Sequence, residues 1–137
     1  MKTWLLDTEP LVAYLDANDA AHAKVVAGLE ALAGQLCTTS AVITEAMYFL
    51  SADPDGPALL AEFLEAGQIQ VFDCAQPPQL KEAALFMKKY ADTPMDFADA
   101  TLVLLAERLN VWSIVTLDRR GFSTYRTRRG KAFRIMP

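Results

Sequence analysis

Residues 93–118 read TPMDFADATLVLLAERLNVWSIVTLD and predict a helix followed by a buried strand. Apolar residues recur at helical spacing after Asp99, so its carboxylate lies at the leading end of a buried stripe, with Asp96 one turn earlier on the same face. The β-rich run at 113–117 predicts a buried strand that stops at Asp118. When a helix leads into a parallel strand, an acid that starts the helix and one that ends the strand can approach each other.

Strands and helices alternate along the rest of the chain. Strands are expected at residues 2–6, 36–38, 69–72 and 132–135, and helices at 9–15, 20–33, 41–51, 58–66 and 79–90. Short links join them, which predicts an α/β fold with a parallel sheet covered by helices on both faces. A turn is expected at 119–125. The inward residues of two helices are expected to be Val25, Val26 and Leu29 in one, and Leu80, Ala83, Ala84 and Met87 in the other.

The composition fits a single domain over residues 1–137, because 53% hydrophobic residues are enough to bury a core. No apolar run approaches the roughly 18 residues of a membrane-spanning helix, and the N-terminal run breaks too early for a signal peptide. We therefore expect a cytoplasmic protein without a membrane segment. Cys37 and Cys74 have no Cys or His partners nearby in the sequence, so both are expected to be reduced and buried. His22 is expected at the surface, without a chemical role.

The charge is distributed unevenly along the chain. The net charge of −4 alone argues against a nucleic-acid-binding protein, but all 17 acidic residues lie at or before Asp118. Seven of the 13 basic residues follow it: Arg119, Arg120, Arg126, Arg128, Arg129, Lys131 and Arg134. This polarity is typical of a phosphate-binding flank beside an acidic site, and a solvated basic tail is the alternative.

Two further acids occupy unusual positions. Asp7 ends the first predicted strand, as Asp118 ends a later one, and Thr8 is the expected cap of the helix that follows; the alternative role for Asp7 is that of the cap. Glu45 has Ala41, Val42, Tyr48 and Phe49 at helical spacing around it, which predicts a carboxylate turned inward or into a cleft. Such a carboxylate is costly unless a cation or several donors compensate, or unless it is protonated. An ion pair is the alternative, but no basic residue before Asp118 is an obvious partner.

These acids are expected to meet at one site, since ligands of open α/β sheets bind beyond the carboxyl ends of the strands. Four carboxylates within a few ångströms of one another repel strongly, and a divalent cation relieves that repulsion. A set of oxygen ligands without His or Cys favours Mg²⁺ or Mn²⁺ over Zn²⁺. The expected set is Asp7, Glu45, Asp99 and Asp118, with Asp96 as a weaker fifth candidate.

Four motifs in this order resemble the PIN domain, especially the VapC-type toxins of VapBC toxin–antitoxin pairs: DTEPLVAYL around Asp7, TTSAVITEAMYFL around Glu45, MDFADATLVLLAERL around Asp99 and SIVTLDRRGF around Asp118. The resemblance covers essentially the whole chain. It implies a three-layer α/β/α sandwich and an endoribonuclease that uses Mg²⁺ or Mn²⁺ at this acidic quartet. Asp96 competes with Asp99 for the third position, and the D-A that precedes the alanine-rich helix favours Asp99. The resemblance also implies that Thr8 and Thr116 support the site.

The hypothesis that follows is metal-assisted hydrolysis of an RNA phosphodiester bond. Asp7 and Asp99 would hold the metal, with Asp118 close by, and Glu45 would orient or deprotonate the attacking water. The resemblance implies products with a 5′-phosphate and a 3′-hydroxyl. Contacts to the RNA phosphates are expected from Arg119, Arg120, Arg126, Arg128 and Arg129. An antitoxin protein and a homodimer partner are also expected, because the hydrophobic content leaves apolar surface for them.

The sequence disfavours several other functions. A phospho-receiver domain needs a second acid near the first strand and a Lys at a later strand end, and neither is present. No Walker loop and no GxGxxG motif occurs, which disfavours nucleotide and dinucleotide binding. Two alternatives stay open: a PIN-domain nuclease outside a toxin pair, and a catalytically silent interaction module whose acids bind a partner's arginines.

Overall fold

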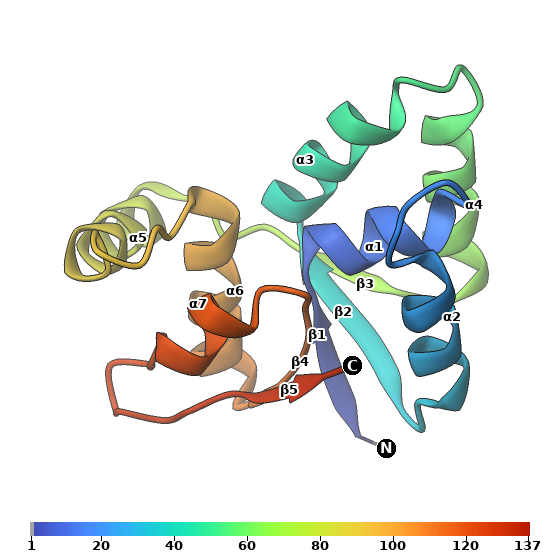
Figure 1. Ribbon diagram of the computed structural model, residues 1–137. Helices are drawn as coiled ribbons and strands as arrows, with labels where there is room; N and C mark the ends of the chain where they lie inside the picture. The colour runs from blue at the N-terminus through green and yellow to red at the C-terminus, as the bar shows by residue number, and fades with distance from the viewer. Residues whose placement is uncertain (1) are drawn as a thin grey trace.

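The computed structural model describes residues 2–137, which form one parallel sheet with helices on both sides (Figure 1). The strands are β1 (Thr3–Leu6), β2 (Gln35–Thr39), β3 (Gln70–Phe72), β4 (Ser113–Val115) and β5 (Arg134–Met136). The helices are α1 (Thr8–Leu15), α2 (His22–Ala31), α3 (Ser40–Leu50), α4 (Gly56–Ala66), α5 (Pro77–Lys89), α6 (Phe97–Leu109) and α7 (Arg119–Thr124). This arrangement confirms the predicted α/β fold with a central parallel sheet.

The sheet order is β3-β2-β1-β4-β5, and every pairing is parallel. The chain therefore moves outward from β1 to β3, returns to the other side of β1 at β4, and ends on the edge strand β5. In Figure 1, α1, α2, α3 and α4 lie on one side of the sheet and α5, α6 and α7 on the other. The direction of winding reverses between β1 and β4, and the space beyond the carboxyl ends of such strands is where open α/β sheets bind ligands.

Helix α6 is the central element of its layer, as the apolar stripe predicted. Nearly all of its residues from Ala98 to Ala106 are buried, with Asp99 the exception, as expected for a helix packed between a sheet and other helices. It begins after Asp96 and ends at Asn110, whose φ of 55° is the left-handed conformation that commonly ends a helix. The start of α6 consequently lies beside the carboxyl ends of β1 and β4, where the predicted acids gather.

Three local expectations are wrong. The segment predicted as a turn at 119–125 contains helix α7, because the side chain of Asp118 accepts a hydrogen bond from the backbone of Gly121 and so caps a helix. The cap of α1 is Asp7 and not Thr8. Leu80 and Ala84 are exposed, since α5 packs against α6 through a narrow face that buries Ala83 and Phe86 instead.

The remaining structural expectations hold in part. Cys37 and Cys74 are free and buried, as predicted. His22 is half-buried and its Nδ1 lies 2.7 Å from the carbonyl oxygen of Ala13, so it joins α2 to the preceding helix. Val25 is fully buried on α2. Across residues 2–137, none of the helices has the length and apolar character needed to cross a bilayer.

Candidate functional site

Asp7 follows β1 and is almost completely buried, with 5% of its surface exposed. Its Oδ1 accepts a hydrogen bond of 2.8 Å from the backbone N–H of Thr8, so the alternative role as a helix cap is real. A helix cap does not need to be buried, so capping alone does not account for the position of Asp7. Burial raises the pKa of the Asp7 carboxyl to about 7. The two hydrogen bonds that it accepts from Thr116 and Thr8 oppose this rise only partly.

Thr116 connects Asp7 to Asp118. Its hydroxyl donates to Asp7 Oδ2 over 2.7 Å, and the same oxygen accepts the backbone N–H of Asp118 over 3.0 Å. Asp118 in turn accepts the Gly121 N–H at 2.9 Å through Oδ1. The carboxyl ends of β1 and β4 are thereby joined through one buried hydroxyl, and each end carries an acid.

Glu45 reaches the same region from α3. Its Oε1 accepts a 2.8 Å hydrogen bond from the hydroxyl of Thr8, the residue that follows Asp7. The apolar surroundings predicted for Glu45 are only partly present, because Tyr48 is 78% exposed and Phe49 57% exposed. Glu45 is half-buried, and the Thr8 hydroxyl connects its carboxylate to the residue next to Asp7.

Asp96 and Asp99 complete a group that we call the acid cluster: Asp7, Glu45, Asp96, Asp99 and Asp118. Asp96 Oδ1 accepts the N–H of Asp99 at 2.8 Å, and Asp99 Oδ2 accepts the N–H of Asp96 at 3.1 Å. This reciprocal arrangement is a capping box, which fixes both carboxylates at the start of α6. The charge of Asp96 also helps to raise the pKa of Glu45. Asp96, the weaker candidate in the sequence, therefore lies with the other four acids.

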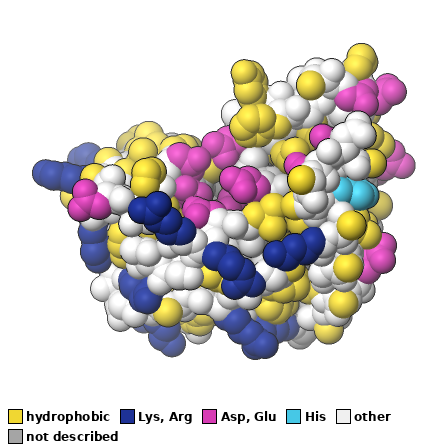
Figure 2. Space-filling model, in the orientation of Figure 1, with side chains coloured by type: hydrophobic (Ala, Val, Ile, Leu, Met, Phe, Trp, Pro, Cys, Tyr) yellow, Lys and Arg dark blue, Asp and Glu magenta, His cyan; other side chains and the backbone are white. Residues whose placement is uncertain are grey.

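Three members of the acid cluster, Asp7, Glu45 and Asp99, have raised pKa values. Burial, and then the charges of Asp7 and Asp96, raise the pKa of Asp99 to about 9. Burial also raises the pKa of Glu45, with a further contribution from Asp96, while the bond from Thr8 opposes it. Across residues 2–137 the ion pairs join Arg128 to Glu82 and Glu107, and none of them neutralises this cluster. Figure 2 shows acidic side chains gathered in the middle of this face, bordered by Lys and Arg over α7 and β5.

The chemistry of these donors fits a hard divalent cation, since every side chain offers carboxylate oxygens and their mutual repulsion is relieved by positive charge. As the side chains stand, no group of three or more acidic, histidine or cysteine side chains within residues 2–137 could enclose one ion. Their oxygens accept backbone N–H groups and hydroxyls instead. Rotation of side chains such as Asp99 and Asp118, at the edges of the cluster, would be needed to complete a coordination sphere.

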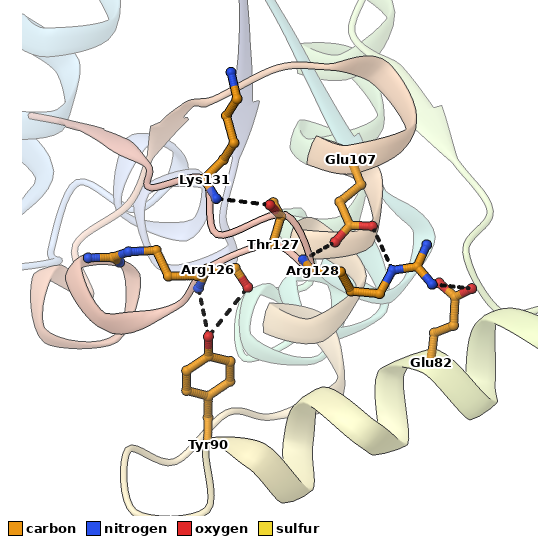
Figure 3. A network of polar contacts seen from close by, with 7 residues as sticks. All are labelled: Glu82, Tyr90, Glu107, Arg126, Thr127, Arg128 and Lys131. Atoms are coloured by element: carbon orange, nitrogen blue, oxygen red, sulfur yellow. Dashed lines mark hydrogen bonds and ion pairs between the residues drawn. The ribbon is translucent and has the colours of Figure 1, made fainter.

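The arginines proposed to hold phosphate differ in their surroundings. Arg128 pairs with Glu107 at 3.3 Å and Glu82 at 3.6 Å, and its backbone N–H donates to Glu107 at 2.7 Å (Figure 3). Arg126 donates to the carbonyls of Ser123 and Tyr125, and Arg119 to that of Pro137. Arg120 and Arg129 are exposed and make no side-chain bond within residues 2–137.

Sequence reasoning missed Tyr125, which lies completely buried next to the acid cluster. Its hydroxyl donates to the carbonyl oxygen of Pro94 at 2.8 Å. Burial, followed by the charges of Asp99, Asp118, Asp96 and Asp7, raises the pKa of Tyr125 well above its usual value. In the sequence, Tyr125 stands out only as an aromatic residue in a predicted turn, which does not indicate a role at the site.

Comparison with known proteins agrees with this geometry. The PIN domain family model matches residues 4–127. Ribonuclease VapC26 of Mycobacterium tuberculosis is 33% identical over 135 residues, which cover 97% of this chain and 99% of that protein. Among solved structures, the Mycobacterium tuberculosis toxin VapC20, described as cleaving the sarcin-ricin loop, has a TM-score of 0.71 at 15% identity, covering 84% of this chain and 89% of that one. A toxin–antitoxin complex from Klebsiella pneumoniae has a TM-score of 0.64 at 16% identity, covering 88% and 91%. The chain therefore belongs to the PIN-domain family and is a homologue of the VapC-type toxins.

Proposed function

We propose that this protein is a metal-dependent endoribonuclease and the toxin of a VapBC-type toxin–antitoxin pair. The observation that carries the proposal is the buried Asp7 carboxylate, which Thr116 connects to Asp118 and which lies beside the Thr8 hydroxyl that binds Glu45. This arrangement occupies the reversal point of a parallel sheet, where ligands of such folds bind. The homology to a protein named a ribonuclease supports the choice of RNA as the substrate.

Asp7 and Asp99 would hold Mg²⁺ or Mn²⁺, with Asp118 as a further ligand, Glu45 close by and Asp96 at the edge of the site. A bound divalent ion supplies charge for a phosphodiester oxygen and lowers the pKa of water. Thr116 and Thr8 keep the Asp7 and Glu45 carboxylates in place by donating to them. Glu45, whose pKa is raised, orients the attacking water and accepts its proton. Products with a 5′-phosphate and a 3′-hydroxyl are the form that the family resemblance implies.

Positive charge for the RNA backbone comes from the C-terminal segment. Arg120 and Arg129 are the best candidates because their side chains are exposed and unpaired within residues 2–137. Arg119 and Arg126 would contribute charge while their side chains remain bound to the protein. Arg128 would contribute least, because Glu82 and Glu107 pair with its charge. Contacts of this kind position a nucleic acid without reading its sequence.

The test of this function is the loss of cleavage in Asp7→Asn and Asp99→Asn. Each variant removes one negative charge and keeps the side-chain shape, so we expect RNA cleavage with Mg²⁺ or Mn²⁺ and growth inhibition to disappear while the circular dichroism spectrum stays unchanged. Asp53→Asn is the matched control, since Asp53 is exposed and its side chain accepts a hydrogen bond from the backbone N–H of Asp55, away from the acid cluster. Full cleavage by either site variant would refute the assignment.

An antitoxin is the expected protein partner. The similar complex from Klebsiella pneumoniae contains an antitoxin, and α3 presents the exposed side chains of Tyr48 and Phe49 close to Glu45. An arginine of the antitoxin that enters the acid cluster would compete with the metal. We also expect a homodimer, to be checked by light scattering of the purified chain.

The alternative of a catalytically silent interaction module makes a different prediction. Mn²⁺ should raise the melting temperature of a nuclease of this kind, because the metal binds the folded state and not the unfolded chain. A docking surface for arginines should show little response to Mn²⁺. A PIN-domain nuclease outside a toxin pair would cleave RNA without inhibiting growth when it is expressed.

A further inference from the structure

The hydroxyl of Tyr125 connects two parts of the fold that each carry members of the acid cluster. Tyr125 ends helix α7, which Asp118 begins. Its hydroxyl donates to the carbonyl oxygen of Pro94 at 2.8 Å and lies 3.5 Å from that of Thr93. Pro94 lies two residues before Asp96, where α6 starts. One hydrogen bond therefore spans from the Asp118 side of the site to the Asp96–Asp99 side.

Gly121 shows how closely Tyr125 and Asp118 approach each other. A Cβ atom added at Gly121 would lie 2.3 Å from Asp118 Oδ2 and 2.9 Å from the Tyr125 hydroxyl oxygen. Both distances are shorter than real Cβ contacts. The two oxygen atoms therefore lie on the side of Gly121 where a side chain would point, and they leave no space for one. The Asp118 carboxylate and the Tyr125 hydroxyl are thus held against one surface of α7.

The ring of Tyr125 is held independently of its hydroxyl. It packs edge-on against Phe122 and Tyr90, with ring centroids 5.1 Å and 5.2 Å apart, and it is completely buried. Removing the hydroxyl would leave this packing in place and would deprive the Pro94 carbonyl of its 2.8 Å donor. The residues before α6 would then lose one of their attachments to the C-terminal segment.

We propose that Tyr125 is a positioning residue: through Pro94 it sets the separation between Asp118 and the Asp96–Asp99 pair, and so sets the affinity of the acid cluster for a divalent cation. This inference rests on the proposed function, because it assumes that the cluster binds such a cation. Tyr125 itself contacts neither the cation nor RNA in this role. Partners of this kind, one step removed from the ligands, typically change metal affinity by about 10–100-fold.

The test compares Tyr125→Phe with Tyr90→Phe. Tyr90 belongs to the same aromatic group, and its hydroxyl also binds backbone: it accepts from the N–H of Arg126 at 2.9 Å and donates to the Arg126 carbonyl oxygen at 3.4 Å. Tyr90 meets the segment before α6 through its backbone carbonyl, which accepts the N–H of Thr93 and is unchanged in Tyr90→Phe. Mn²⁺ affinity of the RNA-free protein is measured by calorimetry. We expect Tyr125→Phe to bind Mn²⁺ about tenfold more weakly and Tyr90→Phe to bind it as the parent protein does, with similar decreases in melting temperature.

A second variant, Gly121→Ala, perturbs the same contact from α7. Its methyl group would push on Asp118 Oδ2 and on the Tyr125 hydroxyl, so Mn²⁺ affinity should again fall. Gly28→Ala on α2 is its control, since the added carbon there would lie 3.2 Å from Pro137 Cβ and 3.8 Å from Met136 Sδ, and neither residue belongs to the acid cluster.

Each outcome decides between specific alternatives. Unchanged Mn²⁺ affinity in Tyr125→Phe would overturn the positioning role, and so would an equal loss in Tyr125→Phe and Tyr90→Phe, which would indicate a general effect of stability. A parent protein that does not bind Mn²⁺ at all would remove the metal site of the proposed function together with this inference.

Discussion

The Thr116 hydroxyl donates a 2.7 Å hydrogen bond to the buried carboxylate of Asp7, although 109 residues separate the two in sequence. The same hydroxyl oxygen accepts the backbone N–H of Asp118 at 3.0 Å. The hydroxyl hydrogen of Thr116 is therefore directed at Asp7, while the hydroxyl oxygen is bound to the backbone of Asp118. Thr116 therefore determines how the ends of β1 and β4 present their acids to each other.

Replacing Thr116 by valine should impair the site more than the fold. Thr116→Val keeps the β-branched shape but removes the donor to Asp7, so we expect Mn²⁺ affinity and RNA cleavage to fall by about 10–100-fold. Thr38→Val is the matched control, because Thr38 is equally buried in the same sheet and its hydroxyl donates to the carbonyl of Leu6 at 2.7 Å. Equal losses of Mn²⁺ affinity in the two variants would mean that the Thr116 hydroxyl has no special relation to the metal.

The metal-free protein should become less stable as the pH rises. The pKa of Asp7 is raised from 3.8 to about 7 and that of Asp99 to about 9, so the folded state binds protons more tightly than the unfolded chain. The contribution of these two groups to the free energy of unfolding is then highest below about pH 4, and it is lost as the pH rises from about 4 to 9. Each unit of pKa difference corresponds to about 1.4 kcal/mol.

Urea denaturation in EDTA at several pH values measures this effect. Asp99→Asn should flatten the profile and should be more stable than the parent at pH 8, because it removes a carboxylate that is costly to ionise. Mn²⁺ should restore the stability of the parent at that pH by binding the folded state. Stability that rises between pH 5 and 9 in EDTA would contradict the raised pKa values.

The arginines of the C-terminal segment should separate into two groups. Arg128 is bound to Glu107 and Glu82, so Arg128→Ala should lower stability by about 0.5–1 kcal/mol and leave the salt dependence of RNA binding nearly unchanged (Figure 3). Arg129→Ala, one residue further, should weaken binding to single-stranded RNA and reduce the slope of log affinity against log salt by about 0.7. Identical slopes for the two variants would show that the ion pairs of Arg128 do not withhold it from RNA.

The sequence could predict the strands and four of the acids because both are encoded locally. An apolar run that stops at an acid, as at Asp7 and Asp118, indicates a strand that ends at a polar site. The reciprocal bonds between Asp96 and Asp99 are also local, since three residues separate them. Their spacing predicts that both acids lie on one face of the helix, but it does not indicate which of the two would bind a metal.

What the sequence could not predict depends on how the elements pack. Tyr48 shares a helical face with Glu45 but is exposed, because the angle of α3 turns that part of the helix away from the sheet. Leu80 is exposed because it lies outside the face of α5 that buries Ala83 and Phe86. The contact of Tyr125 with Pro94 joins residues 31 positions apart through a buried hydroxyl, and no periodicity marks such a pair.

Glu45 should affect the rate of cleavage more than the binding of metal. Glu45→Gln keeps an oxygen that can accept the Thr8 hydroxyl bond, but it cannot take a proton from water, so we expect the cleavage rate at saturating Mn²⁺ to fall by about 10²–10⁴-fold.

In the parent protein the rate should increase with pH as the carboxyl group of Glu45, whose pKa is raised, loses its proton. Single-turnover rates across a pH series measure both effects. The cleavage rate of Glu45→Gln should lack the increase with pH. Its Mn²⁺ affinity should stay within about threefold of that of the parent, a smaller change than the loss of a residue that supports a metal ligand typically causes. If Glu45→Gln instead loses Mn²⁺ binding and recovers its rate at high Mn²⁺ concentration, Glu45 acts as a metal ligand and not as the base.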